Sequence, residues 1–191
     1  MQSMIEKPLS FRSQKEWSAW LSKNHTRVEG IWLRLYKKAS GVTSVNHDQA
    51  LDSVLCYGWI DGQTKPFDKD SWIQKFTPRR AKSLWSKRNI EHTERLIKTK
   101  KMRAPGMREI ERAKSDGRWH AAYDSPSKVT IPEDFLIRLS KNKKALAFFK
   151  SLNKTNRYSI AWRLQTAIKP QTREKRMETI LAMMRERKKF H

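Results

Sequence analysis

The chain has 191 residues, of which 37% are hydrophobic and 32% are charged, and eight of them are tryptophan. This length suits one domain, or one domain with a substantial extension, and the apolar content can build a core, which excludes wholesale disorder. With 42 Lys and Arg against 19 Asp and Glu, the formal net charge is +23, so the sequence predicts an anionic partner.

The positive charge is unevenly distributed along the chain. Residues 1–75 have 11 basic and 8 acidic side chains, whereas residues 76–191 have 31 and 11, which gives net charges of +3 and +20. A field of this size attracts polyanions and speeds their encounter with the protein. The alternative interpretation is that the charge only keeps the surface soluble.

The sequence pattern shows neither a secretory signal nor a membrane-spanning segment. There is no apolar run of eighteen residues, and the first eight residues lack the apolar core of a secretory signal. Cys56, the single cysteine, can form no intramolecular disulfide and stands among apolar residues, where a buried, inert thiol is expected. These features predict a cytoplasmic protein without a transmembrane segment.

A helix and then a strand are predicted near the start of the chain. Ser13 and Glu16 have the spacing of a capping box, and Trp17 and Leu21 follow on one helical face. Residues 30–37 alternate between apolar and polar side chains, which indicates a strand with one buried face.

Two further helices are predicted in this half of the chain. Residues 46–57 have helical spacing, and Gly58 can end that helix in a left-handed conformation. Ser83 can cap a longer helix over residues 84–98.

Between these helices the sequence predicts a hairpin. Residues 59–63 and 71–76 read as its two strands, joined by a polar loop that is longer than a tight two-residue turn. In this pairing, residues 59–61 lie beside residues 72–74.

The rest of the chain predicts helices only, about five of them. The last helix carries a one-sided apolar stripe at helical spacing, formed by Met177, Ile180, Leu181 and Met184. The fold class is therefore α+β: a small antiparallel sheet with packed helices, in the order α-β-α-β-β-α, followed by an all-helical C-terminal part. The Pro105–Gly106 break divides the chain into an α+β domain over 1–104 and a basic helical region over 105–191, packed on the first.

Several short blocks are distinctive in composition: Cys56–Gly62, Phe76–Arg80, Trp85–Asn89, Asp116–Trp119 and Phe190–His191. In these blocks the chain resembles the YdeI/OmpD-associated family, and the similarity extends from Trp17 over nearly the whole chain. The resemblance implies a small α+β protein grouped with the YjbR/CyaY-like fold. It also implies a link to protection against bacteriocins or antimicrobial peptides through an outer-membrane porin.

The first candidate site is the pair Arg79 and Arg80, with Ser83 and Asn89 at the start of the helix that follows. Guanidinium groups and the free amides of a helix N-terminus both favour a phosphate or a carboxylate. Asp61 is expected nearby. As a structural residue it either pairs with Arg79 or caps the turn at Gly62; alternatively it acts as an acid-base group, with Arg79 steadying an anionic intermediate.

No motif defines a reaction. The sequence has no P-loop, dinucleotide or nucleophile-elbow pattern, and its five histidines are scattered without metal-ligand spacing. We therefore expect no metal and no other cofactor. A binding protein is favoured over an enzyme.

The second candidate site is the basic half of the chain. Its residues expected to contact phosphates are Lys141, Lys143, Lys144, Arg185, Arg187, Lys188 and Lys189. A further cluster consists of Lys98, Lys100, Lys101 and Arg103. Most tryptophans stand at periodic positions typical of a core, so base stacking is the weaker interpretation of them. Nucleic acid is the first candidate partner, and a phosphorylated small molecule is the second.

Overall fold

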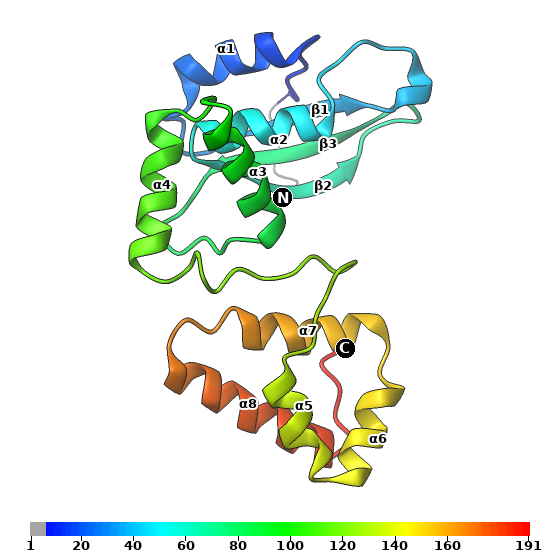
Figure 1. Cartoon of the computed structure of the whole chain (residues 1–191). Helices are drawn as coiled ribbons and strands as arrows, with labels where there is room; N and C mark the ends of the chain where they lie inside the picture. Colours follow the sequence, from blue (N-terminus) through cyan, green and yellow to red (C-terminus); the bar gives the residue numbers. More distant parts are fainter. Residues whose placement is uncertain (1–6) are drawn as a thin grey trace. The chain divides into compact units, whose positions relative to one another are not determined.

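The computed structural model describes residues 7–191, and the α+β class is confirmed (Figure 1). Residues 1–6, part of the stretch without a secretory signal, lie outside the described residues. Two compact units are formed: the first contains the chain up to Ser83 together with Glu91–Arg112, and the second contains Leu84–Ile90 and Ala113–His191. Within residues 7–191, no helix has the length and apolar character needed to span a membrane.

The first unit is built on a three-stranded antiparallel sheet in the order β1-β3-β2. Its strands are β1 (Ile31–Tyr36), β2 (Trp59–Pro66) and β3 (Ser71–Pro78). Alternate residues of β1 are buried, as the sequence pattern predicts, because only one face of the strand meets the core.

The register of the hairpin differs from the prediction. Asp61 pairs with Phe76, and a bulge separates it from Thr64, which pairs with Gln74. The expectation that residues 59–61 lie beside residues 72–74 is therefore wrong. Strand β2 continues through Pro66, which pairs with Trp72, so the strands extend closer to the loop than the sequence predicts. Pro66 is tolerated there because β2 is an edge strand, where a residue without an amide hydrogen can stand.

Helices α1 (Gln14–Asn24) and α2 (His47–Cys56) pack beside the sheet and supply much of its core (Figure 1). The amide of Glu16 donates to Ser13 Oγ at 3.2 Å, so Ser13 caps α1 as predicted. The Glu16 carboxylate accepts from the Arg12 amide at 2.9 Å in place of the Ser13 amide that the capping box predicts. Gly58 ends α2 with a φ of 74°, which is also as predicted. A short 3₁₀ turn, η1 (Lys38–Ser40), follows β1.

Helix α3 (Lys87–Lys98) begins later than the sequence predicts. Its cap is Ser86, whose Oγ accepts from the Asn89 amide at 3.1 Å. Ser83 Oγ instead accepts from the Arg80 amide at 2.9 Å. Ser83 was a plausible cap by residue type, but its hydroxyl is used in a local turn before the helix.

Helix α4 (Ala104–Ser115) contains Pro105 and Gly106 in its first turn, where the sequence suggested a break. A Cβ at Gly106 would lie 2.5 Å from the carbonyl oxygen of Cys56, so this glycine permits a close approach of α4 to the end of α2. The division into domains at residues 104 and 105 stays a prediction.

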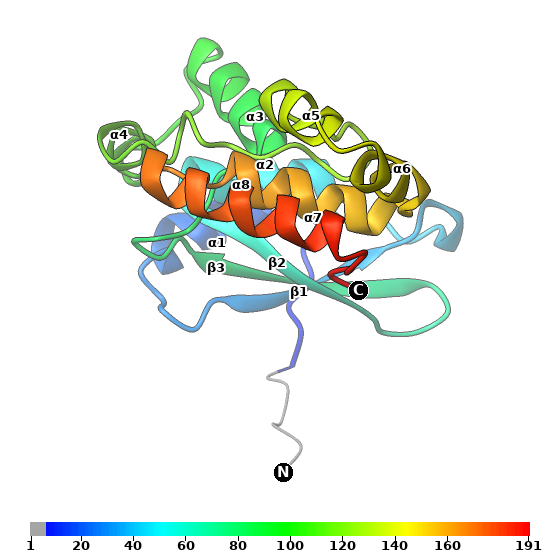
Figure 2. The ribbon, with the colours of Figure 1, turned by 90° about the horizontal axis from the view of Figure 1, so that it is seen from below.

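The second unit has its own core. Its helices are α5 (Glu133–Ser140), α6 (Lys143–Ser151), α7 (Lys154–Gln165) and α8 (Pro170–Arg185). Helix α8 packs against the other three, and Figure 2 shows α7 and α8 side by side. The predicted stripe of α8 is confirmed, because all four of its apolar residues are buried: Met177, Ile180, Leu181 and Met184.

Candidate anion-binding surfaces

The two arginines that follow β3 lie in the first unit. Arg79 is only 6% exposed, and its amide donates to the Gly58 carbonyl oxygen at 3.0 Å. Arg80 is exposed and is tied through its amide to Ser83. Asn89 belongs to the second unit. Binding of one anion by these four residues stays a prediction.

Asp61 lies on the face of the sheet that carries the core residues Trp59 and Phe76. Its side chain is partly buried. Within residues 7–191 the carboxylate has no hydrogen bond or ion pair, so the expected contact with Arg79 is not formed. A catalytic role of Asp61 stays a prediction.

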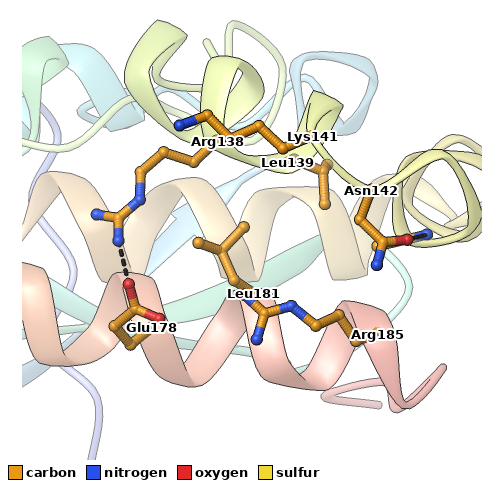
Figure 3. Close-up of a pocket in the computed structure, with 8 residues that line it drawn as sticks. Arg138, Leu139, Lys141, Asn142, Glu178, Leu181 and Arg185 are labelled. Atoms are coloured by element: carbon orange, nitrogen blue, oxygen red, sulfur yellow. Dashed lines mark hydrogen bonds and ion pairs between the residues drawn. The ribbon is translucent and has the colours of Figure 1, made fainter.

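All seven cations predicted to contact nucleic acid are exposed on the helical unit. Two of them, Lys141 and Arg185, line one groove of about 350 Å³ between α5, α6 and α8. Figure 3 shows Arg185 extending from α8 along this groove. The other residues that line it are Arg138, Leu139, Asn142, Ala145, Glu178 and Leu181. Packing thus brings together two cations that are 44 positions apart in the sequence.

Among the described residues, neither Lys141 nor Arg185 has an acidic partner. Arg138 differs, because its Nη1 donates to Glu174 Oε1 at 2.7 Å and its Nη2 pairs with Glu178 across the groove (Figure 3). The hydrogen bond that Arg138 donates to Glu174, together with the nearby carboxylate charges, raises the pKa of the Arg138 guanidinium. The positive charge of the groove that is open to a ligand therefore belongs to Lys141 and Arg185.

The N-terminus of α6 strengthens the field beside the groove. Asn142 caps this helix, and its Oδ1 accepts from the Ala145 amide at 2.9 Å. Lys143 and Lys144 occupy the first turn, at the positive end of the helix dipole. Each cation there is disfavoured by about 0.3–1 kcal/mol, and an anion nearby would offset that cost.

The remaining three cations lie on residues 186–191, here called the C-terminal strap: Arg187, Lys188 and Lys189. The start of the strap is held by the Lys188 amide, which donates to the Met183 carbonyl oxygen at 2.8 Å. Its far end is held by Asn156, whose Oδ1 accepts from the Phe190 amide at 3.0 Å. The strap therefore presents its cations on backbone that is anchored at both ends.

Comparison with known protein families gives two matches along the chain. Residues 9–109, more than half of the chain, match the family model described as "Domain of unknown function (DUF8412)". The chain belongs to this family. Residues 128–187 match a second family model, described as "Bacteriocin-protection, YdeI or OmpD-Associated". Searches of curated proteins and of solved structures each find no match.

The predicted YdeI/OmpD-associated resemblance is thus confirmed, but by another part of the chain. Its family model covers α5–α8 of the helical unit. Three of the blocks on which the resemblance rests lie in the DUF8412 part instead: Cys56–Gly62, Phe76–Arg80 and Trp85–Asn89.

Two features of the groove in this DUF8412 protein differ in how far the sequence signals them. Asn142 caps α6 directly beside Lys143, and an asparagine before a helical run is a signal that sequence reading can use. The neutralisation of Arg138 has no such signal in the sequence, because Glu174 and Glu178 belong to a helix 36 to 40 residues away.

In the part of the chain that the structure describes, no group of three or more His, Cys, Asp or Glu side chains could hold a metal ion.

Proposed function

We propose that the helical unit binds nucleic acid by contacting backbone phosphates, without reading the base sequence. The observation that carries this proposal is the groove between α5, α6 and α8. Lys141 lines it from the turn after α5 and Arg185 lines it from α8, and neither has an acidic partner among the described residues. Lysine and arginine side chains are the usual phosphate ligands, and such contacts supply most of the affinity of non-specific binding.

Two neighbouring features support the same partner. Lys143 and Lys144 add charge at the positive end of α6, and the anchored strap adds Arg187 and Lys189. Lys188 contributes less, because its ammonium already pairs with a carboxylate of Glu186 at 2.7 Å. A partner with charge repeated along a chain can use several of these cations at once, whereas a single small anion cannot.

The test measures binding of the purified chain to a fluorescent duplex DNA and to a single-stranded RNA at several salt concentrations. If about four to six phosphates are contacted, log affinity should fall against log salt with a slope of about −4 to −5 on duplex DNA, since each contact contributes about −0.9. Replacing Arg185, Arg187, Lys188 and Lys189 together by glutamine should flatten this slope without unfolding the unit, because all four are exposed.

A matched pair of variants separates a shaped groove from diffuse charge. Lys141→Gln with Arg185→Gln removes two charges from the groove, and Lys169→Gln with Lys175→Gln removes two exposed charges at the other end of α8. Lys175 and Arg185 are about 15 Å apart along the helix. We expect the first pair to weaken binding at least tenfold and the second pair at most about threefold. Equal weakening by both pairs, or no salt-sensitive binding at about 50 mM salt, would contradict the proposal.

The proposed location is the cytoplasm, supported by the single buried cysteine, which suits a reducing compartment. Cell fractionation tests it, and a periplasmic form would contradict it. Such a form would favour the bacteriocin-protection role that the family description names.

A further inference from the structure

A second cavity lies in the first unit, where α1, α2 and α3 meet the turn that precedes α4. Its volume is about 390 Å³, within the range of pockets that hold small ligands. Its lining residues come from four segments: Gln14, Lys15, Ser18, Asp52, Ser53, Cys56, Tyr57, Leu96, Lys100, Lys101 and Arg103.

Four cations line this cavity: Lys15, Lys100, Lys101 and Arg103. All four are exposed, and none makes an ion pair within residues 7–191. Like charges that share one cavity repel each other, and an anion between them would relieve this repulsion.

The cavity has one carboxylate, and that group is already occupied. Asp52 Oδ1 lies 2.6 Å from His92 Nδ1 and 2.6 Å from an Arg95 nitrogen, and the same nitrogen donates to Asp52 Oδ2 at 2.8 Å. Arg95 therefore balances the charge of Asp52, and the four lining cations keep theirs. The chemistry of the cavity is that of an anion receptor.

The turn that carries three of the cations has a defined backbone. Lys100 has a φ of 54°, and the Lys101 amide donates to the Leu96 carbonyl oxygen at 2.9 Å, which together form the left-handed end of α3. The Arg103 amide donates to the Cys56 carbonyl oxygen at 3.3 Å and ties the turn to α2. The backbone that carries the cations is thus fixed by two helix ends.

Lys100 stands where glycine is the usual residue. A left-handed conformation costs about 1–2 kcal/mol for a residue with a Cβ, and such positions concentrate at ligand sites. Glycine would remove the strain but also the ammonium group.

The two serines of the cavity use their hydroxyl protons on each other and on α2. Ser53 Oγ donates to the Gln49 carbonyl oxygen at 3.0 Å, and Ser18 Oγ lies 3.0 Å from Ser53 Oγ. Since the Ser53 proton is used on Gln49, Ser18 is the donor of the second bond. Leu96 and Cys56 supply apolar surface beside these groups.

We propose that this cavity binds the phosphate monoester of a small phosphorylated ligand, through Lys100, Lys101 and Arg103 together with Lys15 of α1. A phosphate monoester has a charge of about −1.5 to −2 at neutral pH and three acceptor oxygens, which matches several converging cations better than a carboxylate does. The site is separate from the groove of the helical unit and does not depend on nucleic-acid binding there.

The test titrates the full chain with inorganic phosphate, pyrophosphate and AMP, followed by calorimetry and by amide chemical shifts. We expect saturable shifts at residues 100–103 and affinity that is weakened at least tenfold by Lys101→Gln with Arg103→Gln. The matched control is Lys38→Gln with Lys69→Gln, which removes two exposed lysines of the same unit outside the cavity and should change affinity less than twofold.

Lys100→Gly gives a second, opposed readout. It should raise the midpoint of thermal unfolding and lower phosphate affinity, so a folding defect cannot explain the loss of binding. The proposal is overturned if millimolar AMP and phosphate cause no saturable shifts. It is also overturned if the control pair weakens phosphate affinity as much as Lys101→Gln with Arg103→Gln does.

Two oligonucleotides identify the source of the phosphate. A 5′-phosphorylated trinucleotide that shifts residues 100–103 more strongly than AMP makes a nucleic-acid end the ligand, whereas stronger shifts with AMP make it a free metabolite. In either case the 5′-hydroxyl trinucleotide should have no effect on these residues. Lys141→Gln with Arg185→Gln should leave all of these shifts unchanged, which separates this site from the proposed nucleic-acid groove.

Discussion

The backbone amide of Lys188 donates to the carbonyl oxygen of Met183, 2.8 Å away, and so closes the C-terminal turn of α8. Arg187, which lies at the start of the strap, has a φ of 55°, and its amide donates to the Met184 carbonyl oxygen. This is the left-handed helix ending in which glycine is the usual residue. Arg187 and Lys100 are the two non-glycine residues with positive φ in the part of the chain that the structure describes.

Arg187→Gly should therefore stabilise the helical unit while it removes a charge. We expect the free energy of unfolding to rise by about 0.5–1 kcal/mol, since glycine adopts this conformation without a steric cost. Urea unfolding measures the change, and Arg187→Gln, which keeps the Cβ, is the control and should have little effect on stability. Both variants should weaken nucleic-acid binding to a similar degree. Lower stability of the glycine variant would contradict the backbone argument.

Gly106→Ala should destabilise the first unit, although helix propensity alone predicts the opposite sign. Alanine in an exposed helix is favoured over glycine by about 1 kcal/mol. Here a Cβ would meet the carbonyl oxygens of Cys56 and Leu55 at 2.5 and 2.6 Å, both on the backbone of α2. We expect a loss of about 1–3 kcal/mol, the cost of overpacking a close contact. Thermal or urea unfolding decides the sign.

Stability should fall in alkaline solution through Cys56. Burial, together with the nearby charge of Asp52, raises the pKa of this thiol from its ordinary value of 9.0 to about 11. The unfolded chain loses the thiol proton first, so this contribution is complete below pH 9 and is lost as the pH rises from 9 to 11. The loss is on the order of 3 kcal/mol, because the shift is about two pKa units and each unit corresponds to about 1.4 kcal/mol.

Cys56→Ala provides the control for this pH dependence, since lysines also titrate in the same interval. The difference in unfolding free energy between the two proteins should narrow as the pH rises from 9 to 11. The folded protein should also react slowly with iodoacetamide at pH 7, where the thiol is protonated. Rapid alkylation of the folded chain, or a constant difference across the interval, would count against a buried thiol.

Asp61→Asn should leave the stability of the first unit within about 0.5 kcal/mol of the wild type, because its carboxylate has no partner to lose within residues 7–191. This outcome differs from that of a structural ion pair, whose removal costs about 1–3 kcal/mol. Urea unfolding measures it. A larger loss would show that the carboxylate has a structural contact in solution, and loss of turnover of an identified substrate with unchanged stability would favour an enzyme.

The local features of the fold could be predicted from the sequence. Three of these features depend on residues within a few positions of one another: the alternation of buried and partly exposed side chains in β1, the Ser13 cap of α1 and the left-handed end of α2 at Gly58. The apolar stripe of α8 is equally local. The excess of positive charge, and with it the expectation of an anionic partner, follows from composition alone.

Only the tertiary structure determined the register of the β2–β3 hairpin, the start of α3 and the clustering of cations in the first unit. Pro66 continues an edge strand because no neighbour needs its amide hydrogen, and Ser86 caps α3 because the hydroxyl of Ser83 is used in a turn. Lys15 and Arg103 share a cavity, although 88 positions separate them. Pairing and convergence of this kind depend on which surfaces bury each other, and that choice is made by the whole chain and not by a window of neighbouring residues.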